Sequence, residues 1–411
     1  MKTILVTIGD ELLTGHTVDT NSAWMGVALN ARGFSVDRRI TVRDVGEEIS
    51  EAIDEAFSKA DVVLVTGGLG PTNDDITKKV LCGYFGTTLA LHKESLQLIE
   101  EFVSMRGYPL TDSNRNQAMV PIGCTPLLNR MGTAPGMWFD HNGKVLVSMP
   151  GVPYEMEYLM SHEIIPRLAE RFHTEKVLHR WVITQGIPEA FLADRLRQFE
   201  AGLPDFIRMA YLPSQGVIKL RLSVYGATPE QEMQLQSKAA GLASEIRDVV
   251  VSEQDESLQQ IVGRLLTEGQ KTLALAESCT GGYIAHLITQ IPGSSAYFKG
   301  GVVAYSNEVK VALLGVNPAT LEAHGAVSTQ TAAEMAEGVR KRLQADYGLA
   351  TTGIAGPDGG TAIKPVGMVC VALASHDKII SETFRFGKHR NNNIIRTANT
   401  ALGKLIRELL S

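Results

Sequence analysis

The residues best suited to chemistry lie where the apolar run TLALA gives way to ESCTGG. The run ends at Glu277 and a predicted helix covers residues 283–291, so the polar residues between them occupy a strand-to-helix turn. Such a turn exposes side chains at the carboxyl end of a strand, and unpaired amides at the helix start can face an oxyanion or a phosphate. A glycine-rich turn with a serine cap is an equally good description of this stretch alone. The candidate residues are Ser278, Cys279, Thr280, Gly281 and Gly282.

A second polar turn supplies a base for the hydroxyl of Ser278. The sequence GGVVAYSNEVK, from Gly300, again runs from strand to polar turn to helix and places Lys310 about one turn into the helix. A partly desolvated lysine loses its proton more easily than a solvated one and can replace histidine as the base beside a serine. Tyr305 could orient that proton, and Ser306 or Asn307 is the expected cap. Considered alone, Lys310 is a solvated helix lysine and Tyr305 the end of a packed strand.

A third turn of the same kind is TTGIAGPDGG, which contains Thr352 and Gly353 and follows the strand-like residues 347–350. Its amides could hold phosphate or carbonyl oxygens. Three polar loops at strand ends within about 150 residues fit ligand binding at the carboxyl edge of an open α/β sheet.

Near the other end of the chain, the strand DVVLVT opens into GGLGPTNDD. The glycines Gly67, Gly68 and Gly70 let the backbone approach a phosphate, but Asp74 and Asp75 would repel one unless a cation intervenes. This conflict predicts a divalent metal together with a phosphorylated ligand. The alternative is that both aspartates cap the following helix and favour its dipole.

Strands and helices alternate on both sides of these turns. Strands are expected at residues 3–8, 34–41, 61–66 and 144–148, with helices at 21–32, 47–58 and 76–85, as in a parallel sheet. Residues 170–252 differ: strands at 176–184 and 217–225 and amphipathic helices at 189–199 and 229–246 indicate a small α+β segment. The polar stretch SEQDES, residues 252–257, marks the last boundary.

Composition fits a multi-domain α/β protein with many tight loops, because 411 residues exceed one typical core and 39 of them are glycine. The net charge is −6, so the chain lacks the excess of basic residues that is typical of nonspecific nucleic-acid binding. We therefore expect no nucleic-acid partner. The four cysteines form no CxxC pair, which argues against a zinc site or a disulfide framework and favours a cytoplasmic location. No run of about 18 apolar residues occurs, so no membrane partner is expected.

Five motifs in one order make residues 255–411 resemble the C-terminal domain of the CinA family: AESCTGG, AYSNEVK, HGAVS, TGIAGPDGG and KPVG. The resemblance implies hydrolysis of the carboxamide of nicotinamide mononucleotide to nicotinic acid mononucleotide and ammonia, with no cofactor. Ser278 would be the nucleophile, Lys310 its general base and Tyr305 an auxiliary partner, while Cys279 is the rival nucleophile. Thr352 and Gly353 would line the nucleotide site. Arg396, in the basic start of the last helix, is the candidate for the phosphate.

Residues 1–168 resemble the N-terminal domain of CinA proteins, which is similar to molybdopterin-binding domains of the MoaB and MogA type. The motifs are GDELLTGHTVDTNS, GGLGPTNDD and MPGVPYEM. The resemblance implies cleavage of ADP-ribose to AMP and ribose 5-phosphate with a divalent metal. The metal or water-orienting candidates are Asp10, Asp74 and Asp75, with Glu11, Asn21 and Glu155 as further ones; Gly67, Gly68 and Gly70 are the phosphate contacts.

The sequence therefore predicts two doubly wound α/β domains joined by a small α+β domain, with boundaries at 1–168, 169–252 and 253–411. CinA proteins have a comparable KH-like middle domain, but the GXXG loop of nucleic-acid-binding KH modules is absent here. Nucleotides are the expected ligands and a homodimer the expected assembly. Two other functions stay open: a molybdopterin- or nucleotide-binding protein without hydrolytic activity, and an interaction protein related to competence or DNA damage.

Overall fold

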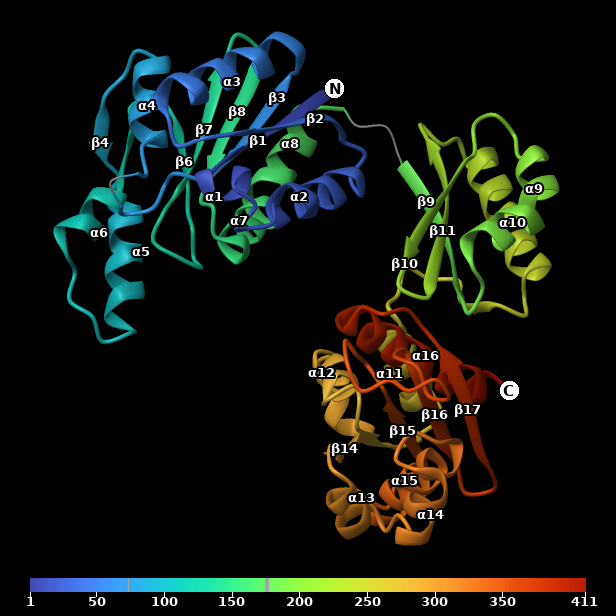
Figure 1. Ribbon diagram of the computed structural model, residues 1–411. Helices are drawn as coiled ribbons and strands as arrows, with labels where there is room; N and C mark the ends of the chain where they lie inside the picture. The colour runs from blue at the N-terminus through green and yellow to red at the C-terminus, as the bar shows by residue number, and fades with distance from the viewer. Residues whose placement is uncertain (73, 174–176) are drawn as a thin grey trace. The chain divides into compact units, whose positions relative to one another are not determined.

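The computed structural model describes residues 1–72, 74–173 and 177–411 (Figure 1). The chain is divided into two compact units. The first is Met1–Val177 with Tyr225–Ala227, and the second is Leu178–Val224 with Thr228–Ser411. Lys176, the first residue of a predicted strand, lies outside the described residues.

A six-stranded sheet forms the centre of the first unit, in the order β2-β1-β3-β8-β7-β6. The first four strands are parallel to one another, and β7 and β6 are antiparallel. The strands are β1 (Lys2–Ile8), β2 (Ser35–Val42), β3 (Val62–Thr66), β6 (Thr125–Leu127), β7 (Gly136–His141) and β8 (Lys144–Met149). A separate two-stranded ladder pairs β4 (Leu89–Leu91) with β5 (Met119–Pro121).

Helices cover both faces of this sheet because its buried strands are apolar on both sides. On β1, Ile4 and Val6 pack with α3 (Gly46–Lys59), whereas Leu5 packs with α2 (Thr20–Asn30) and the helices after β8. The helices after β8 are α7 (Pro153–Leu159), a π-helical turn (Met160–Ile164) and α8 (Ile165–Arg171). The remaining helices of the unit are α1 (Asp10–Leu13), α4 (Thr77–Tyr84), α5 (Lys93–Ser104) and α6 (Asp112–Gln117).

The second unit contains two sheets. The smaller has the order β10-β11-β9-β12, with helices α9 (Glu189–Ala201) and α10 (Pro229–Glu245). Its strands are β9 (Val177–Gln185), β10 (Arg208–Ser214), β11 (Val217–Tyr225) and β12 (Val250–Ser252). This is the predicted small α+β segment.

The larger sheet has the order β14-β13-β15-β16-β17. The strands β14 (Phe298–Val303), β13 (Leu273–Glu277) and β15 (Tyr347–Gly353) are parallel, whereas β16 (Met368–Ala374) and β17 (Ile379–Arg385) are antiparallel additions. The carboxyl ends of the three parallel strands therefore meet at one edge, as the sequence predicts. The helices are α11 (Leu258–Glu268), α12 (Tyr283–Thr289), α13 (Asn307–Leu314), α14 (Pro318–His324), α15 (Thr329–Arg342) and α16 (Arg390–Leu410), with a 3₁₀ turn at Ser294–Ala296.

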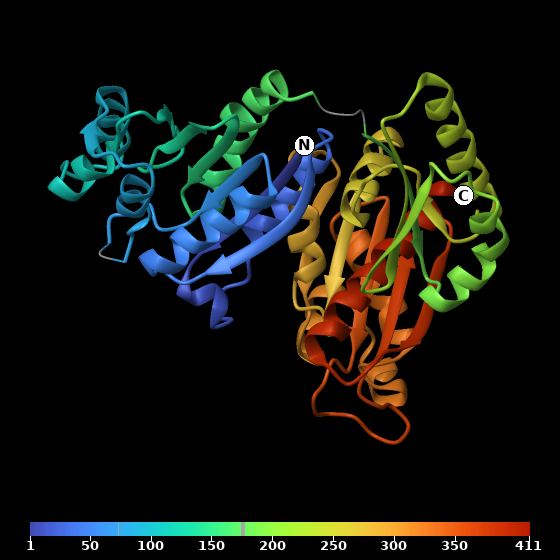
Figure 2. The ribbon, with the colours of Figure 1, turned by 90° about the horizontal axis from the view of Figure 1, so that it is seen from above.

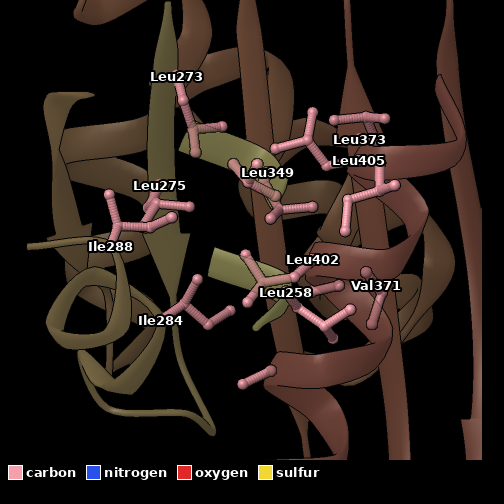
Figure 3. Close-up of a cluster of buried hydrophobic side chains, with 14 of the residues drawn as sticks. Leu258, Leu273, Leu275, Ile284, Ile288, Leu349, Val371, Leu373, Leu402 and Leu405 are labelled. Atoms are coloured by element: carbon pink, nitrogen blue, oxygen red, sulfur yellow. The ribbon is translucent and has the colours of Figure 1, made fainter. Parts of the chain in front are cut away.

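Alternating residues of β13 supply both cores of this domain. Leu273 and Leu275 point into a cluster with side chains of α11, α12 and α16 (Figure 3). Ala274 and Ala276 pack on the opposite face with α15. The helix α16 lies along one face of the sheet (Figure 2). The predicted fold class is thereby confirmed.

The small sheet shares its core with the larger domain, since Ile183 and Val217 belong to the cluster formed by α11 and α16. Gln185 also accepts a hydrogen bond from Arg407 at its carbonyl (2.8 Å) and donates one to the carbonyl of Asn399 (3.2 Å). The predicted domain boundaries stay predictions. Within the described ranges, none of the helices combines the length and apolar character needed to span a bilayer.

Candidate active sites

Ser278 lies directly after β13, at the carboxyl edge of the larger sheet of the second unit. Its amide continues the strand pairing by donating to the carbonyl of Thr351 (2.9 Å). The chain then turns through Gly281 and Gly282, whose φ angles of 64° and 96° lie in the left-handed region that glycine adopts without strain. The turn thereby holds the hydroxyl at a fixed place above the strand end.

The side chain of Lys310, on α13, contacts Ser278. Ser306 caps α13 by accepting from the amide of Val309, and the side chain of Lys310 is only 1% exposed. The Lys310 Nζ donates to Ser278 Oγ (3.2 Å) and to the carbonyl of Ala304 (2.7 Å). Burial lowers the pKa of Lys310, so the neutral amine that can act as a base is more accessible than in a solvated lysine. This burial excludes the alternative of a solvated helix lysine.

Cys279, the neighbour of Ser278, packs into the hydrophobic core. Its side chain is 7% exposed and belongs to the core cluster beneath the turn. Burial raises the pKa of the Cys279 thiol to about 12, which keeps the thiol protonated. A protonated thiol is a poor nucleophile, whereas the hydroxyl of Ser278 has the amine of Lys310 beside it (3.2 Å).

The start of α12 is occupied by a carboxylate. Glu277, which is 2% exposed, accepts hydrogen bonds from the amides of Gly282 (3.1 Å), Ile284 (3.1 Å) and Ala285 (2.8 Å). The expectation that these helix-start amides face an oxyanion is therefore wrong. The sequence reasoning missed this role of Glu277, because Glu277 ends β13 and does not stand at the N-cap position of α12, where a capping carboxylate is expected.

The amides that remain for an oxyanion come immediately after Ser278. The Gly281 amide donates to the carbonyl of Ser278 (3.2 Å), so it is not available. Among the described residues, no other residue accepts from the amides of Cys279 and Thr280. The Thr280 hydroxyl is bonded to that of Thr351 (2.7 Å) and fixes this part of the turn.

Tyr305 and Arg390 are in hydrogen-bond contact. Tyr305 lies between Ala304 and Ser306, is 64% exposed, and accepts a hydrogen bond from Arg390 Nη2 (3.1 Å). Arg390 Nη1 also donates to the carbonyl of Gly356 (2.8 Å), in the loop after β15. The first residue of α16 thus links two of the three predicted loops.

The other predicted residues of this site make no hydrogen bond to Ser278 or Lys310 within the described part of the chain. Asn307 is exposed at the first position of α13, and Arg396 is exposed on α16 without a hydrogen bond or ion pair to the described part of the chain. Thr352 is buried and donates to the carbonyl of Ala326 (2.8 Å), and Gly353 ends β15. Arg390 therefore lies nearer the predicted loops than Arg396 does.

A cavity of about 320 Å³ lies at the carboxyl edge of the sheet in the first unit. The three predicted glycines and most of the predicted carboxylates line this cavity. Its polar and glycine lining includes Gly9, Glu11, Asp44, Gly67, Gly68, Gly70, Asp74, Asp75, Gly151 and Glu155. Asp10 does not line it; this residue is exposed at the start of α1, and its amide donates to Asp44 Oδ2 (3.2 Å).

The glycine loop leaves a short stretch of amides open to this cavity. Gly67 donates to the carbonyl of Met149 (3.1 Å) and Gly70 to Asp75 Oδ1 (2.7 Å), so their amides are occupied. Within the described ranges, the amides of Gly68 and Leu69 have no partner. Asp75 also accepts from the Thr72 amide (2.8 Å) and thus closes its own loop. Of the three glycines, Gly68 offers the phosphate contact.

Asp44 is a carboxylate that the sequence reasoning missed. It follows the end of β2, so the strand-end rule used for the other loops could have found it. Burial raises the pKa of Asp44, and repulsion from Glu11, Asp10 and Asp74 adds to the shift. Burial also raises the pKa of Glu155, which accepts a hydrogen bond from Asn129 Nδ2 (2.5 Å).

The crowding of carboxylates around Asp44 fits a cation, because a positive charge would offset their mutual repulsion. Among residues 1–72, 74–173 and 177–411, no three His, Cys, Asp or Glu side chains converge on a point that would hold a metal ion. A divalent ion held by Glu11, Asp44 or Asp74 would therefore need oxygens of a ligand or water to complete its coordination.

Comparisons with known proteins cover the whole chain. Family models match the CinA C-terminal domain over residues 255–409 and the domain described as "Probable molybdopterin binding domain" over residues 4–170. A CinA-like protein of Flavobacterium psychrophilum is 43% identical over 418 residues, which cover 100% of this chain and 99% of the relative. A CinA-like protein of Cytophaga hutchinsonii is 43% identical over 406 residues, covering 98% and 97%. The crystal structure of CinA from Thermoplasma acidophilum aligns with 42% of this chain and 98% of that chain, at 34% identity and a TM-score of 0.37.

Proposed function

The chain belongs to the CinA family, and we propose that its C-terminal domain hydrolyses the carboxamide of nicotinamide mononucleotide to nicotinic acid mononucleotide and ammonia. The observation that carries the proposal is the buried contact of 3.2 Å between Lys310 Nζ and Ser278 Oγ. A neutral amine at that distance can accept the hydroxyl proton.

The reaction proceeds through an acyl-enzyme. Lys310 takes the proton of Ser278, whose oxygen attacks the carboxamide carbon. The amides of Cys279 and Thr280 stabilise the resulting oxyanion. Lys310 then gives its proton to the departing nitrogen, ammonia leaves, and a water that Lys310 deprotonates releases the acid. Arg390, next to the hydroxyl of Tyr305, is a candidate cation for the substrate phosphate.

Ammonia release from nicotinamide mononucleotide by the full chain tests this proposal. We expect Ser278→Ala and Lys310→Ala to lose activity by about a thousandfold or more, within the range for removing a nucleophile or its base. Cys279→Ala, the matched control beside the nucleophile, should retain most of it. Loss in Cys279→Ala with activity kept in Ser278→Ala would assign the reaction to the thiol instead.

A second activity is proposed for the first unit: metal-dependent cleavage of ADP-ribose by water to AMP and ribose 5-phosphate. Support comes from the open amides of Gly68 and Leu69 and the carboxylates Glu11, Asp44 and Asp74 around one cavity. A divalent metal bound there would offset the pyrophosphate charge and lower the pKa of the attacking water. Gly68 and Leu69 would position a phosphate by their amides.

The second proposal demands a divalent cation. Cleavage should stop in excess chelator, and Asp74→Ala should lose most of it. Asp75→Ala should also lose activity, because Asp75 closes the loop that presents the amides. Full cleavage in chelator would exclude the metal mechanism. If the protein binds nucleotides without turning any over, the non-hydrolytic alternative applies to this domain.

A further inference from the structure

The helix α2 presents an uncharged face at the surface of the first unit. None of its eleven residues, Thr20–Asn30, is acidic or basic. Met25 and Leu29 are buried in the core beneath the helix, whereas Val27 is 73% exposed. A helix at a protein surface normally carries charged residues on its outer side, and a helix that is apolar all round is normally covered. The composition of α2 therefore fits a helix whose outer side also contacts a partner.

The helix α3 covers the opposite face of the same sheet and shows the usual pattern. Its buried residues include Ile49 and Ile53, which face the sheet. Its exposed positions are charged: Glu47, Glu51, Asp54 and Lys59. Since both helices cover one sheet, the uncharged face of α2 is a property of that helix and not a requirement of the fold.

The uncharged face continues onto the elements beside α2. Val18, in the preceding loop, is 76% exposed and lines a small pocket together with Pro153, the first residue of α7. The next residue, Tyr154, is 52% exposed. Trp24 of α2 and Tyr158 of α7 are half-buried against the same core cluster, and the two helices contact each other (Figure 1). We call this surface the α2–α7 patch; its residues are Val18, Trp24, Val27, Tyr154 and Tyr158.

The residues of the α2–α7 patch are those of a protein–protein interface. Tryptophan and tyrosine are the side chains that most often dominate binding energy, and contiguous exposed apolar surface marks interaction sites. A second copy of the chain is a partner that needs no charge opposite α2 itself, because the helix carries none.

The charges at the two ends of α2 favour such self-association. Asp19 caps the start of the helix, and Arg32 lies two residues beyond its end. Arg32 is exposed, and its guanidinium has no partner in the described part of the chain. If two copies of α2 pack antiparallel across a two-fold axis, Asp19 of each copy comes close to Arg32 of the other, and the helix dipoles oppose each other favourably. The surface is then complementary to itself in charge.

Arg39 determines which side of α2 can make this contact. It lies on β2, and a Cβ added at Gly26 would be 2.8 Å from its Nη2. A two-fold contact on the β2 side would bring two Arg39 guanidiniums together, so the contact belongs on the α7 side. We propose that the α2–α7 patch binds the same patch of a second copy, making the protein a homodimer through its first unit. The proposal does not depend on either proposed activity.

Sedimentation velocity of the full chain over a range of concentrations tests the proposal. We expect the unmodified protein to dimerise and Val27→Glu to weaken the dimer about a hundredfold or more, because it buries an unpaired charge from each copy. Val45→Glu is the matched control: Val45 is 42% exposed before α3, on the opposite face of the sheet, and its substitution should leave the dissociation constant within about twofold. Arg32→Glu should weaken the dimer about fivefold or more at low salt, and less at high salt.

Each outcome decides a part of the proposal. A monomeric unmodified protein, a Val27→Glu variant that dimerises as tightly as its parent, or equal weakening by Val45→Glu would overturn it. Weakening by Val27→Glu without any by Arg32→Glu would keep the patch and reject the antiparallel orientation. A monomer that sediments with phosphatidylcholine–phosphatidylglycerol vesicles, unless it carries Val27→Glu, would assign the patch to a membrane instead. Circular dichroism checks the fold of each variant, and Ala23→Glu, one turn earlier on the exposed side of α2, replaces Val27→Glu if that variant does not fold.

Discussion

At the scale of single residues, the charge state of Lys310 governs the proposed chemistry. Burial lowers the pKa of this lysine, and only its neutral form can accept the proton of Ser278. We expect kcat/KM for nicotinamide mononucleotide to rise tenfold per pH unit while the lysine is protonated and to level off above its lowered pKa. Lys310→Arg should lose about a hundredfold or more, because a guanidinium stays protonated. A flat profile from acidic to alkaline pH would contradict a lysine base.

A second prediction at this scale concerns Glu277. Its carboxylate accepts three amide hydrogen bonds at the start of α12, in a buried position. Glu277→Gln keeps the size but turns an NH₂ group toward amide donors, so we expect a loss of about 1–3 kcal/mol in the free energy of unfolding. Urea denaturation followed by circular dichroism measures it. Glu308→Gln, on the exposed first turn of α13, is the control and should change stability by less than about 0.5 kcal/mol.

At the scale of elements, the sequence predicts the strand-to-helix turns well because each is local. Apolar runs end at polar and glycine residues, and parallel strands bring those ends to one edge. What the turns do with their hydrogen bonds was less predictable. Glu277 accepts from the helix-start amides and Asp75 closes its own loop, since backbone amides without a backbone partner take a nearby carboxylate. The contact between Arg390 and Tyr305 joins residues 85 positions apart, which no local pattern reveals.

The close approach of α15 to α13 gives a prediction about helix positions. A Cβ at Gly338 would lie 1.8 Å from the carbonyl oxygen of Leu314, so backbone would have to move. We expect Gly338→Ala to destabilise the protein by about 1–3 kcal/mol, as overpacking does. Gly241, inside α10, is the matched control: its Cβ would lie 3.9 Å from Phe199, so alanine should stabilise by about 0.5–1 kcal/mol. Thermal unfolding of both variants measures the contrast, and a Gly338→Ala variant as stable as the parent would refute the close approach.

At the scale of the whole molecule, the two proposed sites belong to different compact units. Each is built at the carboxyl edge of its own sheet and over its own hydrophobic clusters. The small sheet with β9 and β11 shares the core of the second unit, through Ile183 and Val217. Each site thus has its own source of stability, which makes independent action the physical expectation.

Independent sites predict separable activities in the full chain. Ser278→Ala should abolish ammonia release and leave ADP-ribose cleavage within about twofold, and Asp74→Ala should do the reverse, because effects of independent sites without shared partners add. In the double variant, the loss of each activity should equal the product of the losses that the two single substitutions cause in that activity. Measuring both reactions on the same preparations of the four proteins makes the comparison. A single substitution that lowers both activities more than tenfold, with the fold intact by circular dichroism, would show that the two units are energetically coupled.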